Sequence, residues 1–224
     1  MSFIEDVNQS IRYLKKQEGW KSAWEQAKKY IVLPFYERHS GYLLRKSLSE
    51  PVIVPTPKIE ITIRQANSND LALFESIVPA LRAKRFINKL QKNEEICYIA
   101  IYQEKIAGFV WAGTMNSPST KTTGLTLGAK EAYFWAGYAA PEYRSQGVVR
   151  SVNLSFCKWF QEQGFEDIIL LVEEENAASL KHVFQMGYQL ENRINYIRIL
   201  KWKRVKLEPT DNLYPLEPIL DHLK

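Results

Sequence analysis

The stretch Tyr138-Ala-Ala-Pro-Glu-Tyr-Arg-Ser-Gln-Gly-Val-Val-Arg150 decides the fold of this chain. It continues an apolar run over 132–139 that is too unbroken for a half-exposed strand and therefore predicts a central strand. Pro141 ends that strand, because proline removes a backbone donor. From Gly147 onward apolar residues recur at helical spacing as far as Gly164, a typical C-terminal cap, so a long helix follows the turn.

A strand, a turn and a helix N-terminus in this order form a potential anion site. The first N–H groups of a helix have no partner within it and lie at the positive end of its dipole, so together they stabilise a bound phosphate. Gly147 allows close approach to the backbone, and Arg144 and Arg150 add positive charge. Any strand-to-helix turn can contain a Gly and an Arg, so this segment alone leaves phosphate binding and a purely structural turn equally open.

The elements on both sides of this stretch alternate between strand and helix patterns. Their types follow from apolar periodicity, from capping residues and from turn residues. The predicted elements are strands over 59–63, 96–102, 106–111 and 167–172, helices over 71–77, after Pro79 and from Asn176 to about 186, a loop over 116–130, and two strands from 187 to about 206. Such alternation predicts an α/β fold.

The two ends of the chain differ from this middle part. Residues 1–33 have the pattern of two amphipathic helices, and three prolines within 35–58 indicate an extended, irregular connector. We therefore expect an N-terminal helical arm with its connector over 1–58, a main domain over 59–205 and a surface tail over 206–224. The basic excess of the arm is compatible with a membrane surface or an acidic partner, but it fits better an arm packed on the domain with its Lys side chains in water.

Composition narrows the class of protein. The 224 residues carry 30 basic and 25 acidic side chains, a net charge of +5 without a basic run, so we expect no nucleic-acid interface. Cys97 and Cys157 in apolar contexts and three scattered histidines predict neither a disulfide framework nor a metal site. No apolar run approaches the ~20 residues of a membrane span. The acidic N-terminus is unlike a signal peptide, so we expect a cytoplasmic protein.

Three short motifs carry a resemblance to a known family. Pro141-Glu-Tyr-Arg-Ser-Gln-Gly147, followed by Asn176-Ala-Ala-Ser179 and Gly187-Tyr188, resembles the acyl-CoA-binding signature of the GCN5-related N-acetyltransferase (GNAT) superfamily. The resemblance covers about residues 59–205 and implies a mixed, twisted sheet with helices on both faces. The family's pyrophosphate loop corresponds to Arg144-Ser-Gln-Gly-Val-Val149, in which Val149 replaces a small residue.

The resemblance implies acetyl-CoA as the cosubstrate. The strand before the loop would lend backbone groups to the pantetheine arm, and the later helix would contact that arm through its first turn. The cofactor-binding residues expected from the resemblance are Tyr138, Ala139, Arg144, Gln146, Gly147, Val148, Val149, Arg150, Asn176 and Ser179. Asn176 is also a typical N-cap, and the two roles are compatible.

Acyl transfer to an amine needs a route for the amine proton and a donor for the leaving thiolate. Glu131 is the expected base, and Tyr133, on the same strand face, is the expected substrate-binding residue or acid. Many family members carry a catalytic Tyr where this chain has Val183, so His182 or Tyr188 would replace it. The alternatives are a solvated Glu131, a structural His182 and a reaction without a dedicated base.

The resemblance therefore implies an N-acetyltransferase that transfers an acetyl or short acyl group from acyl-CoA to an amine by direct attack in a ternary complex. A small amine or an amino sugar is the expected acceptor, and a homodimer is one option for the assembly. Two other functions stay open. One is a non-catalytic acyl-CoA-binding module, which Val183 and Val149 favour, and the other is transfer of a longer acyl chain at a membrane surface, which would use the basic arm.

Overall fold

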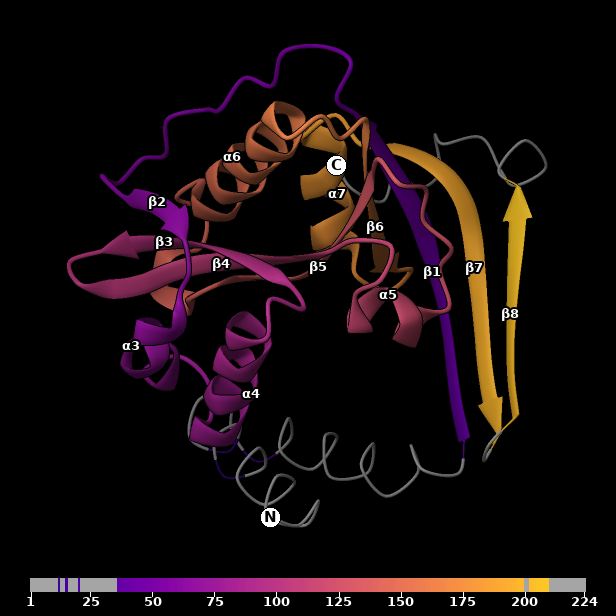
Figure 1. Ribbon diagram of the computed structural model, residues 1–224, viewed down its shortest axis with the longest axis horizontal. Coiled ribbons are helices and arrows are strands. Elements are labelled where there is room, and N and C mark those ends of the chain that lie inside the picture. The colour runs from indigo at the N-terminus through magenta and orange to yellow at the C-terminus, as the bar shows by residue number, and fades with distance from the viewer. Residues whose placement is uncertain (1–11, 13–14, 16–19, 21–35, 200–201, 210–224) are drawn as a thin grey trace.

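The computed structural model describes residues 12, 15, 20, 36–199 and 202–209. In this part of the chain, eight strands form one sheet in the order β2-β3-β4-β5-β6-β1-β7-β8 (Figure 1). The strands are β1 (Tyr36–Ser47), β2 (Thr62–Gln65), β3 (Ile96–Tyr102), β4 (Lys105–Gly113), β5 (Glu131–Ala139), β6 (Asp167–Glu173), β7 (Gln189–Ile199) and β8 (Trp202–Pro209). Strands β5 and β6 pair in parallel and the other neighbours pair antiparallel, so the mixed sheet is confirmed.

Helices cover both faces of the sheet, as predicted. One face carries α6 and α7, and the other carries α3, α4 and α5 (Figure 1). Their bounds are α3 (Leu71–Glu75), α4 (Ala80–Gln91), α5 (Pro118–Thr123), α6 (Val148–Glu162) and α7 (Ala177–Gln185). Two short 3-10 turns, η1 (Ser68–Asp70) and η2 (Pro141–Tyr143), precede α3 and α6. All the helices expected within the described part of the main domain are therefore present.

Aromatic side chains hold α6 against the sheet. Phe156 is fully buried, and its ring lies 4.9 Å from that of Phe134 on β5 and 4.3 Å from that of Tyr98 on β3. Burying one such side chain contributes about 1.5–3 kcal/mol, so this contact fixes the helix over β5. The helix begins after Gly147, whose φ is +82°, and Gly164 follows its end with φ +81°, as the capping pattern predicts.

The prediction of an irregular connector over 35–58 was wrong for residues 36–47, which form β1. This strand pairs with β6 on one side and with β7 on the other. A Cβ at Gly41 would lie 2.6 Å from the Val172 carbonyl oxygen, so β1 approaches β6 closely at this glycine. Residues 48–61 do lack regular structure and run along α6. The division of the chain into domains stays a prediction.

Three further boundaries differ from the predictions. The segment 116–130, expected to be a loop, contains the short helix α5, whose Ser119 N–H donates to Glu95 at 2.8 Å. Strand β2 begins three residues later than the strand predicted from 59. Residues 206–209, assigned to the tail, belong to β8, where they pair with β7. The arm helices predicted over 1–33 and the rest of the tail lie almost entirely outside the described residues.

Candidate active site

The parallel strands β5 and β6 separate halfway along β5. They pair only over residues 131–134. On its other side β5 pairs Tyr138 with Phe109 and Trp135 with Trp111, so Ala136 and Gly137 together oppose the single residue Val110. Ala136 has φ +50°, and this arrangement is a β-bulge, which bends a strand. The bulge therefore turns the second half of β5 away from β6.

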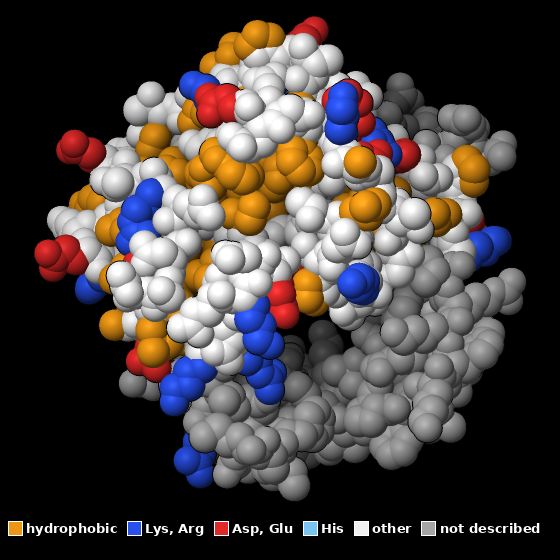
Figure 2. Space-filling view, viewed as in Figure 1, with side chains coloured by type: hydrophobic (Ala, Val, Ile, Leu, Met, Phe, Trp, Pro, Cys, Tyr) orange, Lys and Arg blue, Asp and Glu red, His pale blue; other side chains and the backbone are white. Residues whose placement is uncertain are grey.

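A cavity of about 150 Å³ lies where the strands separate. Its walls come from five elements, namely β4, β5, β6, α6 and α7. The lining includes 134–137 of β5, 170–172 of β6, Val149 and Asn153 of α6, and Ser179, His182, Val183 and Met186 of α7. Figure 2 shows hydrophobic side chains gathered near the middle of the molecule, in the region between α6, α7 and β5. The space is narrow and mostly apolar, with unpaired strand edges beside it.

The turn between β5 and α6 presents a run of backbone donors. Ser145 and Gly147 both have positive φ, +61° and +82°. Within the described part of the chain, no hydrogen bond uses the six consecutive N–H groups from Ser145 to Arg150. The Gln146 carbonyl points instead to the connector, where it accepts a hydrogen bond from Lys58 N at 2.9 Å. Such consecutive donors at a helix N-terminus suit an anion with several oxygens.

The other residues expected to bind the cofactor lie around this turn and cavity. Asn176 caps α7, since its Oδ1 accepts from Ser179 N at 3.1 Å. Arg150 reaches across to α7, where it donates to the Gln185 carbonyl at 3.2 Å, whereas Arg144 is exposed. The Tyr138 ring stacks on the Phe109 ring of β4, with 5.2 Å between the ring centres. The structure thus brings the predicted residues to one end of β5.

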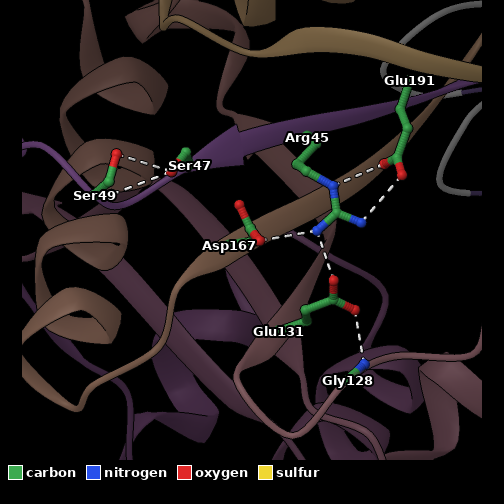
Figure 3. Close-up of polar contacts among 7 residues, drawn as sticks. All are labelled: Arg45, Ser47, Ser49, Gly128, Glu131, Asp167 and Glu191. Carbon is green, nitrogen blue, oxygen red and sulfur yellow. Dashed lines mark hydrogen bonds and ion pairs between the residues drawn. The ribbon is translucent and has the colours of Figure 1, made fainter.

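Glu131 is held by ion pairs at the opposite end of β5. Arg45 on β1 contacts three carboxylates, at 2.6 Å for Glu131, 3.0 Å for Asp167 and 3.0 Å for Glu191 (Figure 3). Glu131 also accepts a hydrogen bond from Gly128 N at 2.7 Å. Burial alone raises its pKa, but the Gly128 hydrogen bond and Arg45 outweigh that effect and lower the pKa below the usual range. A carboxylate with a lowered pKa is a weak proton acceptor.

Tyr133 lies on the same face of β5 as Glu131, as predicted, but it is buried. It packs in an apolar cluster with Leu43, Leu127 and Ile169 and is 6% exposed. Burial, together with the charge of Glu95, raises its pKa to about 12. Its hydroxyl group therefore stays protonated at neutral pH.

Tyr188 lies on the other face of the sheet, in the core beneath α6. It is 2% exposed, and its hydroxyl group donates to Asn153 Oδ1 at 3.1 Å. Cys157 Sγ lies 3.7 Å from the same hydroxyl oxygen. The three side chains predicted to be catalytic, Glu131, Tyr133 and Tyr188, are thus not brought together at one point.

Besides Ser179, two polar side chains line the cavity. His182 lines it, and its Nε2 is buried without a hydrogen-bond partner among the described residues. Burial and the nearby Arg150 lower the pKa of His182, so its imidazole is neutral at pH 7. Asn153 lines the same space, and sequence reasoning missed it because a polar residue within a helical pattern is unremarkable. Val183, at the position of the family's Tyr, also faces the cavity.

Comparison with known families agrees with this geometry. A family model described as the acetyltransferase (GNAT) family matches residues 64–188. The chain belongs to this family. The matched part of this GNAT chain runs from β2 to the residue before β7 and includes the bulge, the turn between β5 and α6 and both helices of the cavity. The resemblance noted in the sequence is thereby confirmed, and no curated protein matches the sequence.

Several solved structures resemble this chain at low sequence identity. A GCN5-related N-acetyltransferase from Sphaerobacter thermophilus superposes with a TM-score of 0.54 at 12% identity, over 82% of this chain and 56% of that one. A Drosophila protein gives a TM-score of 0.53 at 10% identity, over 80% and 56%. An aminoglycoside N-acetyltransferase in complex with CoA gives 0.47 at 19%, over 57% and 91%. This chain thus spans 56% of the length of the first two structures, and the likeness concerns the fold.

Neither a helix that could span a membrane nor a candidate metal site occurs among the described residues. None of the helices there combines the length and apolar character that crossing a bilayer requires. In the same part of the chain, no three His, Cys, Asp or Glu side chains converge in a way that could hold a metal ion.

Proposed function

We propose that this protein transfers an acetyl or other short acyl group from acyl-CoA to an amine, with both substrates bound at once. The observation that carries this proposal is the run of six unused N–H groups from Ser145 to Arg150 beside the cavity between β5 and β6. A pyrophosphate group needs several donors at one place, and an extended arm with two amides needs a narrow groove with free strand edges. Acyl-CoA combines the two, and this site fits both parts.

Each part of the site has a distinct task in binding acyl-CoA. The backbone from Gln146 to Arg150, with Arg144 and Arg150, would hold the pyrophosphate. The part of β5 beyond its pairing with β6, which includes Tyr138 and Ala139, and the first turn of α7, at Asn176 and Ser179, would hold the pantetheine arm. Bound acyl-CoA supplies a thioester, which an amine can attack directly.

The proposed acceptor is a small amine or an amino sugar that binds on the face of β5 covered by α4 and α5. Glu131, Asp167 and Glu191 bring three negative charges to this face against the single positive charge of Arg45. The resulting charge of about −2 attracts a cationic amine. Since Glu131 is a weak base, we assign deprotonation of the amine to water rather than to a dedicated side chain.

We assign the hydrogen bond to the leaving thiolate to His182. His182 and Tyr188 are the two side chains that could replace the family's Tyr, since this chain has Val183 at that position. The Tyr188 hydroxyl group donates its hydrogen bond to Asn153, whereas His182 faces the cavity with a ring nitrogen that has no partner among the described residues. A neutral imidazole carries one N–H donor, which suits this task.

The location of the protein in the cytoplasm and its assembly as a homodimer stay predictions.

The test is calorimetric titration with acetyl-CoA, alongside release of free thiol with a panel of amines and amino sugars. Gly147→Trp should abolish binding, because the added Cβ would lie 3.6 Å from Pro57 Cα and a side chain as large as an indole would push the turn away from the connector. Gly164→Trp is the matched control, since Gly164 has the same positive φ, +81°, with nothing within 4 Å of an added Cβ. Binding that survives Gly147→Trp, or absence of binding to the unaltered protein, would overturn the proposal.

A second function, an acyl-CoA-binding module without turnover, is favoured by one observation. Val183 lines the cavity at the position where the family's Tyr is expected, while Glu131, the expected base, forms an ion pair with Arg45. This function predicts tight binding of acetyl-CoA with no amine-dependent thiol release. The same two measurements therefore separate the two functions.

A further inference from the structure

Asn153 is a buried polar residue whose position demands an explanation. It lies in the second turn of α6, lines the cavity and is only 5% exposed. Its Oδ1 accepts two hydrogen bonds, one from the Tyr188 hydroxyl group at 3.1 Å and one from Cys157 Sγ at 3.5 Å. A buried amide normally satisfies its donors as well as its acceptor, because an unused donor costs about 1–3 kcal/mol.

These two contacts fix which way the amide faces. Burial raises the pKa of Cys157 to about 12 and that of Tyr188 well above its ordinary value, so both groups keep their protons. The Tyr188 hydroxyl group and the Cys157 thiol both donate to Oδ1, which is the acceptor that they share. The amide nitrogen of Asn153 therefore points away from them, and within the described residues no hydrogen bond uses it.

We propose that Asn153 binds the pantetheine arm of acyl-CoA by donating a hydrogen bond from its side-chain amide to a carbonyl oxygen of that arm. Tyr188 and Cys157 are then positioning residues that hold the amide in this orientation. The inference rests on the proposed function, since it concerns the same cosubstrate.

The position along α6 selects the part of the ligand. Six residues separate Asn153 from Gly147, which corresponds to about 9 Å along a helix axis. The two amides of pantetheine lie between its phosphate end and its sulfur. If the phosphate is held at the turn, these amides therefore come before the sulfur along the cavity. Asn153 is therefore opposite the amide region, whereas His182 is left for the sulfur.

The test compares two ligands that share the nucleotide end. CoA contains the pantetheine arm, and adenosine 3′,5′-bisphosphate lacks it. Asn153→Asp keeps the size and the acceptor for Tyr188 and Cys157 but removes the donor. We expect the Kd for CoA and for acetyl-CoA to rise about tenfold by calorimetry, because a hydrogen bond is lost and a repulsive oxygen faces the carbonyl. The Kd for adenosine 3′,5′-bisphosphate should not change.

Tyr188→Phe provides a second variant that introduces no charge. It removes one of the two donors that hold Asn153, so the Kd for CoA should rise about two- to threefold and that for the bisphosphate should again stay constant. Cys157 should become more reactive toward a thiol reagent, because its surroundings loosen. Thermal unfolding of both variants, followed in parallel, shows whether the fold persists.

The outcomes separate the inference from the proposed function. Equal loss of both ligands in Asn153→Asp would make Asn153 a structural residue and overturn the inference. An unchanged Kd for CoA would overturn it as well. A loss of affinity for acetyl-CoA alone would mean that the Asn153 amide donates to the thioester carbonyl and not to the pantetheine arm. If the unaltered protein bound neither ligand, the proposed function itself would fail.

Discussion

Arg45 Nη1 and Glu131 Oε1 lie 2.6 Å apart, although 86 residues separate them in the sequence. The contact joins β1, two strands away across the sheet, to the first residue of β5. The same guanidinium group also binds Asp167 at the start of β6 and Glu191 on β7 (Figure 3). One cation thus ties together four strands, and this geometry gives Glu131 a structural role.

Glu131→Gln should therefore affect stability more than turnover. We expect the free energy of unfolding to fall by about 0.5–1.5 kcal/mol, because one of three partly exposed partners of Arg45 loses its charge. Thiol release with the best amine should fall less than about threefold. A general base would contribute about 100-fold or more, so a loss of that size would return Glu131 to the base role.

Acid titration gives an independent check on the same residue. The folded-state pKa of Glu131 lies below the ordinary value of 4.5. Its contribution to stability is therefore present above pH 4.5 and is lost as the pH falls through the lowered pKa. Denaturant unfolding between pH 6 and pH 3 should show a smaller loss of stability for Glu131→Gln than for the unaltered protein. Identical pH profiles would contradict the ion-pair assignment.

Substitutions of His182 should separate turnover from binding. His182→Leu removes the donor that faces the cavity and should lower kcat about tenfold. His182→Gln keeps an N–H group and should retain most of the activity. Calorimetry should give both variants a Kd for CoA within about twofold of the original. A larger change in Kd than in kcat would place His182 in binding instead.

The connector should support the anion-binding turn through its backbone. Lys58→Pro removes the N–H that bonds the Gln146 carbonyl at 2.9 Å, which would free this oxygen to face a bound phosphate. We expect the Kd for CoA to rise about three- to fivefold. Lys58→Ala, which keeps the N–H, is the matched control. If both variants lost the same affinity, the charge of Lys58 rather than its backbone would be responsible.

Gly41→Ala should test the position of β1 in the sheet. The added Cβ would lie 2.6 Å from the Val172 carbonyl oxygen, a backbone atom that cannot move freely, so the free energy of unfolding should fall by about 1–3 kcal/mol. Gly137→Ala is the control, since its nearest contacts would be at 4.0 Å. A neutral Gly41→Ala, measured by denaturant unfolding, would be incompatible with the pairing of β1 and β6.

Local features of the sequence predicted much of the fold. Gly164 has the positive φ expected of the residue that follows a helix, Gly147 directly precedes α6, and Asn176 caps α7. The strand over 96–102, the strand that follows it and the central strand that ends before Pro141 were also predicted correctly, and they are β3, β4 and β5. These features depend on residues within a few positions of one another, so the sequence displays them directly.

The errors concern segments whose structure depends on distant partners. Residues 36–47 carry polar side chains and a glycine, and they form a strand because β6 and β7 offer backbone groups on both sides. Helix α5 lies within a polar segment, where Glu95 accepts a hydrogen bond from its first turn. No local sequence pattern predicts such contacts, because the periodicity of apolar residues indicates which side chains are buried and not which segments form hydrogen bonds with each other.

The sequence by itself determined the order of the elements from β2 onward, apart from α5, and the turn between β5 and α6, because caps, turn residues and apolar periodicity are properties of residues close together in the chain. The tertiary structure decided the chemistry of the surrounding side chains. It tied Glu131 to Arg45, buried Tyr133 and turned the amide of Asn153 toward the cavity by way of Tyr188, 35 residues away. The charge, exposure and orientation of a side chain are set by its neighbours in space, and only the folded sheet brings those neighbours together.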